Sequence, residues 1–481
     1  MDLTDLAFTS ALEQAEMIRR REISPLELTE LYLQRIAQFN PQLGCYVHVA
    51  AEVAIADATA KTEALTHTSD LPPFYGVPIP IKDLDPVAGM PCSYGLSILK
   101  NRIAAADNGV VRRVKQAGFV ILGKTATSEV GTLPYTENNG FLPVRNPWNL
   151  DYTPGGSSGG AAAALAAGLC PIAQGSDGGG SIRGPAFCCG LVGIKPSRGR
   201  VTHAPYGDRL SGAAIEGPLG RSVADAAALL DVLSGYEPGD PYWLPDPEPS
   251  FLHSAQTPPP CLRIGFSTTI EPVGAADPIC QQAVLDTVRQ LETLGHQVES
   301  APRMDFSELI DPFIIVFQAV LAEAGVPPFF LNKMNRWWWV KAQLCSSGKY
   351  LRAVAKMQCV ARQIVTKFEA AMDVLVLPTY MHPPITVGEW AKLSPPKTLE
   401  KIIHWIAPCP PFNATGQPAI ALPTGFAPNG LPIGVQLVGR LGDEATLIAL
   451  AGQLEAQITK TRSRPAFASQ GESLTQLAPS A

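Results

Sequence analysis

The sequence of 481 residues is short of charged side chains and has no pattern that marks a metal or nucleic-acid site. Asp, Glu, Lys and Arg make up 17% of it, the formal net charge is −6, and no block of five or six basic residues occurs. We therefore expect no nucleic-acid partner. The seven histidines are scattered and no Cys-x-x-Cys pair occurs, so we expect no metal site.

Neither a disulfide framework nor a membrane anchor is indicated. Ten cysteines are dispersed along a long apolar chain, which is typical of a reducing compartment. The first ten residues, MDLTDLAFTS, have no basic segment followed by an apolar one, so they do not form a signal peptide. The apolar runs at 161–172 and 312–322 are too short to span a bilayer. We expect a soluble, cytoplasmic protein without stable membrane insertion.

The apolar residues, 46% of the chain, follow patterns that alternate between strand and helix. In the first 60 residues, which look helical, Ser24, Pro25 and Glu27 form a helix-capping signal. A proline-rich stretch at 236–261 is expected to run over the surface. Short strands are predicted at 77–83, 119–122, 373–379, 418–424 and 431–440. We predict a single α/β domain with a variable helical insertion.

A serine on a glycine-rich stretch is the most unusual local feature. Residues 175–186, GSDGGGSIRGPA, place Ser181 behind three glycines with no histidine within fifteen residues. A plain turn is the commonest meaning of such a stretch, and a phosphate loop is disfavoured because GxxxxGK[ST] is absent. Residues 155–159 match the GxSxG nucleophile elbow, but the NPWNLDYTP before them cannot form the strand that this elbow follows.

Three residues far apart in the sequence could supply a catalytic system without histidine. Lys82 ends an apolar strand, where lysine is rarely buried without a task, and burial would lower its pKa and leave a neutral amine. Ser157 could relay a proton from Ser181 to that amine. The amides of Gly178, Gly179, Gly180 and Ser181 could face an oxyanion.

These stretches resemble the amidase signature family of serine amidohydrolases. The resemblance covers about residues 10–460 and is carried by PIPIKD, GKTATSEVG, NPWNLDYTPGGSSGG, GSDGGGSIRGPAFCCGLVGIKPSRGRV and the C-terminal FNATGQPAIALPTGF and GLPIGVQLVGR. It implies Lys82 as catalytic lysine, Ser157 as bridging serine held by a cis peptide, and Ser181 as nucleophile. Ser158, Asp177 and Arg183 are expected in support, the last two as an ion pair bracing the glycine loop.

The resemblance also implies a fold and an activity. We expect a mixed, twisted sheet covered by helices on both faces, and a hydrolase of linear amides that needs no cofactor and acts on a small-molecule substrate. The A subunit of a glutamyl- or aspartyl-tRNA amidotransferase and a non-catalytic binding protein are the alternatives, and a homodimer is compatible with the sequence. The predicted parts are N-terminal helices at about 5–60, a catalytic core at about 70–235, a variable helical region at about 240–370, a C-terminal core at about 371–465, and a flexible tail at 466–481.

Two features fit the resemblance less directly. Family members often have Thr, Ile or Ala where this chain has Gly178, and the extra glycine frees the backbone beside the expected oxyanion hole. The run RWWWV at 336–340 could belong to the core, line an acyl pocket, or face a membrane. Three consecutive residues of a helix point in different directions, so at least one of the three tryptophans should be partly exposed.

Overall fold

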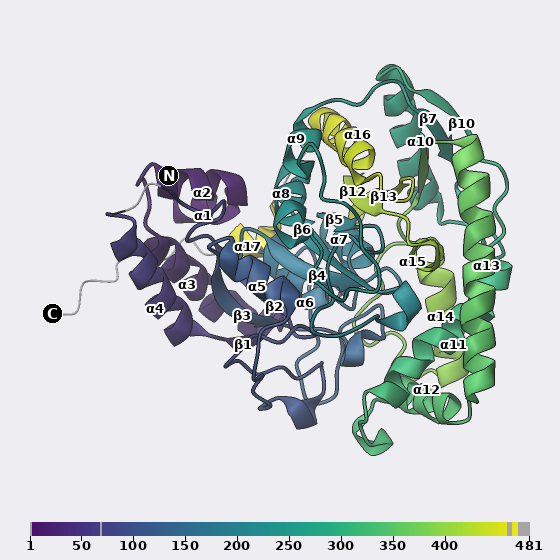
Figure 1. Cartoon of the computed structure of the whole chain (residues 1–481), viewed down its shortest axis with the longest axis horizontal. Coiled ribbons are helices and arrows are strands. Elements are labelled where there is room, and N and C mark those ends of the chain that lie inside the picture. Colours follow the sequence, from purple (N-terminus) through teal and green to yellow (C-terminus); the bar gives the residue numbers. More distant parts are fainter. Residues whose placement is uncertain (1, 68–69, 459–463, 470–481) are drawn as a thin grey trace.

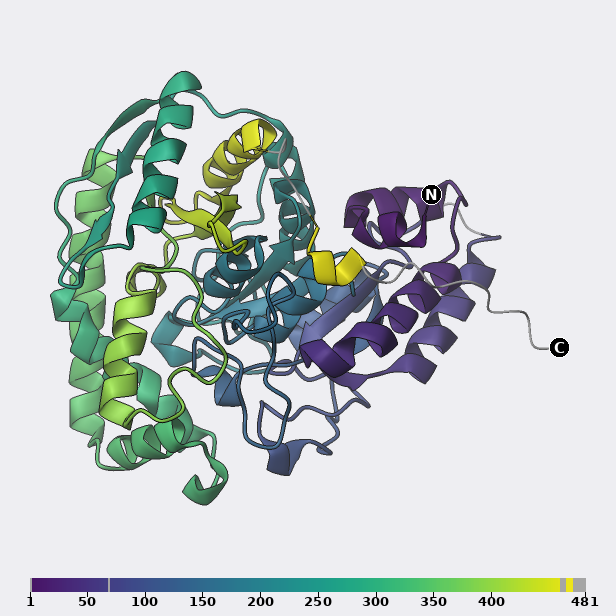
Figure 2. The same cartoon turned by 180° about the vertical axis from the view of Figure 1, so that it is seen from behind.

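The computed structural model describes residues 2–67, 70–458 and 464–469. Its centre is a mixed β-sheet, with the N-terminal helices at one end of the molecule and long helices along the other (Figures 1 and 2). A continuous cluster of buried apolar side chains extends from Leu6 to Ala468. This shared core agrees with the predicted single α/β domain.

The main sheet has eight strands in the order β10-β7-β11-β13-β12-β5-β6-β4. The pairs β10/β7 and β11/β7 are parallel, and the other pairs are antiparallel, so the sheet is mixed as predicted. The strands are β4 (Ala173–Asp177), β5 (Val192–Lys195), β6 (Ile215–Gly220), β7 (Arg263–Phe266), β10 (Gln297–Ser300), β11 (Val374–Pro378), β12 (Ala419–Phe426) and β13 (Pro432–Val438).

A second sheet holds the strand that ends in Lys82. It has the order β1-β3-β2, with β1 at Tyr46–Val49, β2 at Pro78–Lys82 and β3 at Val120–Thr125. β2 lies next to β4 of the main sheet, and the Lys82 amide donates to the Gln174 side chain at 3.1 Å. A two-stranded ribbon of β8 (Thr269–Ile270) and β9 (Gly274–Ala275) completes the strands of the described residues.

Helices form the N-terminal end and both faces of the main sheet. Ser24 caps the third helix in the predicted capping box with Glu27. The helices up to the middle of the chain are α1 (Leu3–Phe8), α2 (Ala11–Arg19), α3 (Pro25–Leu43), α4 (Ala51–Ala64), α5 (Gly109–Gln116), α6 (Gly159–Ala166), α7 (Arg183–Cys189), α8 (Val223–Leu233) and α9 (Phe251–Gln256). Short 3-10 turns lie at η1 (Ser97–Leu99), η2 (Glu129–Gly131) and η3 (Leu210–Gly212).

The second half of the chain supplies the long helices. These are α10 (Pro278–Thr293), α11 (Ser307–Glu323), η4 (Pro328–Phe330), α12 (Lys333–Gln343), α13 (Ser347–Ala371), α14 (Pro395–Ile406), α15 (Pro410–Thr415), α16 (Glu444–Ile458) and α17 (Ala466–Ser469). α7 and α10 both pack on β12 and β13 without packing on each other, so they cover opposite faces of the sheet. Outside the sheet, α11 packs against α12 and α13.

Three local expectations need adjustment. The N-terminal region is not wholly helical, because β1 interrupts it and pairs with β3. The proline-rich stretch includes α9, whose Phe251 is buried. The tail expected at 466–481 begins with the short helix α17, and its residues from 470 onward lie outside the described residues.

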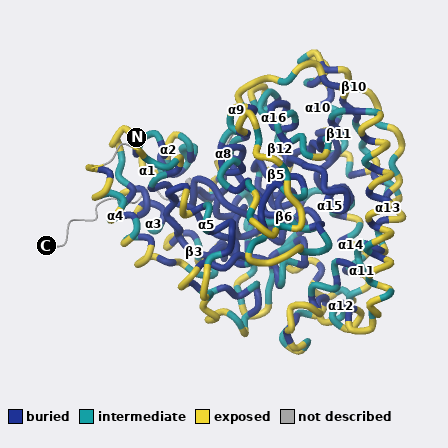
Figure 3. The backbone as a smooth tube through the Cα atoms, viewed as in Figure 1, coloured by how far each residue is buried: buried dark blue, intermediate teal, exposed yellow. Residues whose placement is uncertain are grey.

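The ten cysteines all lie in the described part of the chain and are free thiols. In the same part of the chain, no helix combines the length and the apolar character that crossing a bilayer requires. The strands β2, β5, β6, β11 and β13 are buried along their whole length, and Figure 3 shows the buried backbone through the middle of the molecule.

Candidate active site

Lys82 is buried at the junction of the two sheets and its amine contacts hydroxyl groups. Its Nζ donates to the Oγ atoms of Ser157 and Ser158, each at 2.7 Å, and to the Oγ of Ser176 at 2.9 Å. β2 carries it there because Pro78–Lys82 is buried along its whole length. The amine is therefore held by neutral oxygens and makes no ion pair with a carboxylate within the described residues.

Burial lowers the pKa of Lys82 from its ordinary value of 10.5 to about 7, against the opposing effect of Asp85 and Asp177. Desolvation disfavours the charged form, and the hydroxyl partners bring no full negative charge to offset it. A large fraction of the amine is then neutral near pH 7. The mechanism that the sequence suggested, burial on an apolar strand, is the principal cause of the lowered pKa.

The segment before α6 places Ser157 against Lys82. The Gly156–Ser157 peptide bond is cis, as the family resemblance implies. The following helix fits closely on the end of β3, because a Cβ on Gly160 would lie 2.4 Å from the Ala126 nitrogen. Small residues in this segment therefore allow the approach that brings the two serine hydroxyls to the amine.

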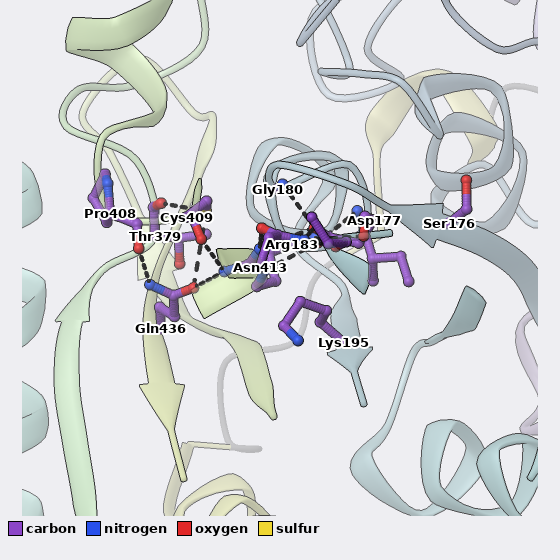
Figure 4. A network of polar contacts seen from close by, with 12 residues as sticks. Ser176, Asp177, Gly180, Arg183, Lys195, Thr379, Pro408, Cys409, Asn413 and Gln436 are labelled. Carbon is purple, nitrogen blue, oxygen red and sulfur yellow. Dashed lines mark hydrogen bonds and ion pairs between the residues drawn. The ribbon is translucent and has the colours of Figure 1, made fainter. Parts of the chain in front are cut away.

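Ser181 lies two residues before the start of α7, in a loop that the predicted ion pair braces. Arg183 donates to both carboxylate oxygens of Asp177 at 2.9 Å, and both side chains are fully buried (Figure 4). Burial alone would raise the pKa of Asp177, but Arg183 outweighs it and the pKa falls well below its ordinary value. A buried pair of this kind holds the loop through geometry more than through net stability.

One expected oxyanion donor is already used. The Gly180 amide donates to Asp177 Oδ1 at 2.7 Å, so it does not point freely at a substrate. The expectation that all the glycine amides are free is therefore wrong at this position. The amides of Gly178, Gly179 and Ser181 have no such acceptor among the described residues and stay available.

The two catalytic serines expected from the sequence are neighbours without a direct side-chain bond. The Ser158 amide donates to the Ser181 carbonyl at 3.3 Å, which fixes the Ser157–Ser158 segment beside α7. No hydrogen bond joins the Ser157 and Ser181 hydroxyls in the described structure. Such contacts are often long in free enzymes and tighten when substrate binds.

Sequence reasoning missed several residues that support the site. Ser176 contacts Lys82, while Asn413 and Gln436 each accept a bond from Arg183 at 2.6 Å (Figure 4). Asn413 and Gln436 both stand in the C-terminal motifs that carry the family resemblance, which is the signal that the sequence offered for them. A second buried lysine, Lys195, donates to the Pro196 carbonyl, and burial lowers its pKa to about 7.

An apolar cavity of about 110 Å³ opens at Ser181. Phe317 stacks on Phe313 with ring centroids 5.8 Å apart and meets Trp338 edge-on at the same distance. Trp338 is buried and lines the cavity, whereas Trp337 and Trp339 are partly exposed, as their spacing predicted. The wall comprises α11, α12, α14 and the loop that carries Ser181, with Gly179, Gly180, Ser181, Ile310, Phe313, Ile314, Phe317, Trp338, Leu399, Ile402, Ile403 and Ile406 among its residues.

A second cavity, of about 290 Å³, lies on the side of Ser157. Charged residues contribute to its wall: Arg209 faces Glu216 at 3.4 Å, and Glu216 also meets His203 at 2.9 Å. Phe317 lines both cavities and so separates them. The residues that line this second cavity include Tyr94, Arg102, Ser157, Ser176, Gly178, Arg209, Glu216 and Glu323.

Gly178, where family members often have a larger residue, packs closely against the side chain of Leu210. A Cβ at this position would lie 2.9 Å from the Leu210 Cδ1 and 3.8 Å from Phe317. Leu210 and Ser211 both have positive φ, at 54° and 52°, a conformation that is uncommon for such residues. The Leu210 side chain of the η3 turn therefore occupies the space that the side chain of a larger residue at position 178 would need.

Comparison with known proteins places this geometry in a family. The family model described as Amidase matches residues 27–448. A protein of Synechocystis sp. described as "Putative amidase" is 50% identical over 465 residues, covering 96% of this chain and 91% of the relative. The structure of 6-aminohexanoate cyclic dimer hydrolase matches with a TM-score of 0.89 and 33% identity, covering 97% of this chain and 99% of that one.

A bacterial aryl acylamidase of the amidase signature enzymes matches with a TM-score of 0.83 and 26% identity, covering 93% of this chain and 96% of that one. The chain belongs to the amidase signature family. Enzymes of this family hydrolyse C–N bonds, so the protein is an amidase-family hydrolase.

Proposed function

We propose that the protein hydrolyses a carboxamide through a serine acyl-enzyme formed on Ser181, with Ser157 and Lys82 as the proton relay. The observation that carries this proposal is the buried Lys82 amine, 2.7 Å from the Ser157 hydroxyl and with a pKa of about 7. An amine in this state can accept a proton near neutral pH, which an ordinary lysine cannot do.

The relay moves two protons during acylation. As Ser181 Oγ attacks the amide carbon, its proton passes to Ser157 Oγ, and the Ser157 proton passes to Lys82 Nζ. The free amides among Gly178, Gly179 and Ser181 stabilise the oxyanion. When the C–N bond breaks, Lys82 returns its proton through Ser157 to the leaving nitrogen. Water then attacks the ester by the same relay and releases the acid.

The direction of proton transfer assigns the two cavities to the two halves of the substrate. Ser157 must reach the leaving nitrogen, so the amine portion lies in the cavity on the Ser157 side, beside Arg209 and Glu216. The acyl portion then lies against Ser181, in the cavity walled by Phe317 and Trp338. We infer a small linear amide with a compact apolar or aromatic acyl group and a more polar amine.

The apolar cavity also bears on the alternatives. An amidotransferase subunit takes ammonia from a polar donor amide, and the isoleucine, phenylalanine and tryptophan side chains around Ser181 offer such a donor few partners. A non-catalytic protein would have no use for the buried Lys82 amine, whose desolvation opposes folding.

The ten free thiols support a reducing, cytoplasmic location.

Labelling with a fluorophosphonate tests the nucleophile. Peptide mapping should find the label on Ser181, and Ser181→Ala should abolish both labelling and hydrolysis of aryl amides. Ser254→Ala, a buried serine on α9 away from both cavities, is the matched control and should keep both. Label on Ser157 or Ser158 instead would refute the assignment. Aliphatic, aromatic and cyclic amides in one panel define the acyl preference.

A further inference from the structure

The outer side of α12 and α13 carries a concentration of positive charge. From residue 324 to residue 368, here called the basic edge, the chain has eight Lys and Arg and no Asp or Glu. Because the whole chain has 37 basic and 43 acidic residues, the remainder holds 29 basic residues against the same 43 acidic ones. The two helices lie along the side of the molecule opposite the N-terminal helices (Figure 1).

Large apolar side chains are exposed on the same edge. Arg336, Val340 and the C-cap residue Leu344 follow at intervals of four residues along α12, and all three are exposed. Leu344 is 81% exposed, and Phe329 and Leu351 are 68% and 65% exposed. Single exposed leucines are ordinary, but several of them among basic residues and partly exposed tryptophans mark an interaction surface.

Most of the positive charge on the edge has no acidic partner. Lys356 forms an ion pair with Glu308 of α11. Within the described part of the chain, the other seven basic residues of the edge form no ion pair. Lys341 is exposed, and its Nζ lies 4.5 Å from the centroid of the Trp337 ring. The edge therefore presents uncompensated positive charge beside apolar side chains.

We propose that the basic edge docks on the surface of an anionic phospholipid bilayer. Lys and Arg are attracted to anionic headgroups, while tryptophan and aliphatic side chains enter the headgroup region. This is peripheral binding and needs no helix that crosses the membrane. It also does not depend on the activity of Ser181. The buried Trp338, between the two partly exposed tryptophans, lines the apolar cavity, so docking would bring that cavity close to apolar amides dissolved in the bilayer.

Charge favours the bilayer over other occupants. A second copy placed on the same surface would bring two sets of eight basic residues together, which is repulsive. Nucleic acid would meet the charge but would leave Phe329, Val340, Leu344 and Leu351 facing phosphate and water. An anionic bilayer offers negatively charged headgroups to the Lys and Arg side chains and an apolar layer to the exposed apolar side chains.

Vesicle co-sedimentation tests the proposal with the full chain. Wild type should bind vesicles of phosphatidylcholine with 30% phosphatidylglycerol, bind pure phosphatidylcholine at least tenfold more weakly, and lose most binding in 0.5 M NaCl. Equal binding to the two vesicle types, or none to either, would overturn the proposal.

Two triple variants locate the surface. The first combines Lys341→Gln, Lys349→Gln and Arg352→Gln. It should weaken vesicle binding about a hundredfold, since each Lys or Arg near an anionic surface contributes about fivefold to the affinity. The control is Arg20→Gln, Arg289→Gln and Arg303→Gln, which changes the net charge equally at three side chains that are more than half exposed on other elements. It should bind within about twofold of wild type. Equal losses in both triples would refute the basic edge as the docking site.

Two further measurements test the contribution of the exposed apolar side chains to vesicle binding and the alternative that a second copy of the chain covers the basic edge. Leu344→Ser should weaken vesicle binding several-fold without changing hydrolysis of a water-soluble amide. Sedimentation velocity on the same proteins detects pairing. A wild-type dimer that dissociates on Leu344→Ser would assign the surface to a second copy and overturn the lipid proposal.

Discussion

The catalytic core and the helical region after residue 300 bury very different side chains around the same site. In the core, Lys82, Lys124, Asp177 and Arg183 are fully or almost fully buried and held by hydrogen bonds. On the other side of Ser181, α11, α12 and α14 contribute isoleucine, phenylalanine and tryptophan. The core thus sets the protonation states of the site, whereas the helices set its shape.

This difference indicates which kind of change each region tolerates. Buried polar networks are costly when one member is removed, because the partner remains desolvated without a hydrogen bond. An apolar wall can be reshaped at the cost of packing alone. Substitutions in the core should therefore change rate and pH dependence, and substitutions in the helices should change which acyl group fits.

The two regions are joined at Glu129. Its carboxylate accepts the Asn332 amide at 2.9 Å and the Asn335 side chain at 2.8 Å, at the start of α12. Asn335 in turn accepts a bond from Thr132 at 2.7 Å. Thr132 and Leu133 line the apolar cavity at Ser181, and Gly131 lines the cavity on the Ser157 side. This junction therefore ties the position of α12, which carries Trp338, to a segment that lines both cavities.

The largest effect is expected from replacing the buried Lys82, compared with the same replacement at a second buried lysine, Lys195. Lys82→Met should lower kcat at least about 1,000-fold, because it removes the proposed base. Lys195→Met is the control: that lysine is equally buried, has a similarly lowered pKa, and contacts the Pro196 carbonyl instead of a serine. It should retain kcat within about tenfold. Comparable losses of kcat in both variants would contradict a special role for Lys82.

The pH dependence should separate catalysis from stability. With a pKa of about 7 for Lys82, kcat/KM should rise through neutral pH and reach a plateau above pH 8, falling about 30-fold at pH 5.5. Between about pH 7 and 10.5 the unfolded chain binds this proton and the folded chain does not, so the free energy of unfolding rises with pH. Below pH 7 both states are protonated and the penalty is constant.

Urea unfolding of wild type and Lys82→Met across pH 6 to 10.5 measures that contribution as a difference. The wild-type free energy of unfolding should gain on the variant as the pH rises. A pH-independent difference, together with a flat activity profile, would mean that the folded protein does not lower the pKa of Lys82.

Breaking the junction should have an intermediate effect. Asn335→Leu removes the bonds to Glu129 and Thr132 and should lower kcat/KM about 10- to 100-fold for a bulky apolar amide. For a small amide such as acetamide the loss should be several-fold smaller, since it makes little contact with α12. Asn335→Asp keeps the acceptor for Thr132 but places a second carboxylate beside the buried Glu129, so its loss should be at least as large as that of Asn335→Leu. Equal losses on both substrates would indicate general destabilisation.

The smallest effect concerns the fit of Gly178 against Leu210. Gly178→Ala should lower kcat/KM several-fold, because the new methyl group meets the Leu210 side chain at 2.9 Å. Leu210→Ala should restore activity to the Gly178→Ala variant by making room for the methyl. The four proteins form a double-mutant cycle in kcat/KM. Additive losses would show that the two positions do not interact and that the glycine serves another purpose.

The sequence by itself determined the family, the α/β class and most of the proposed chemistry. The spacing of apolar residues located β2, β3 and β11–β13, and the capping signal located the start of α3. The glycine-rich stretches identified Ser157, Ser158 and Ser181. These signals are local: they depend on residues that adjoin in one strand, turn or helix, and that is the range over which a sequence pattern specifies structure.

The contacts that refine the site were decided by the tertiary structure. Ser176 reaches Lys82 because β2 and β4 lie side by side, and the Gly180 amide is taken by Asp177 because the loop folds back on itself. Asn335 joins Thr132 across 203 positions of sequence. Contacts over such separations depend on how whole elements pack, and side-chain burial, which lowers the pKa of Lys82, is the result of that packing. The same packing leaves the basic edge of α12 and α13 exposed.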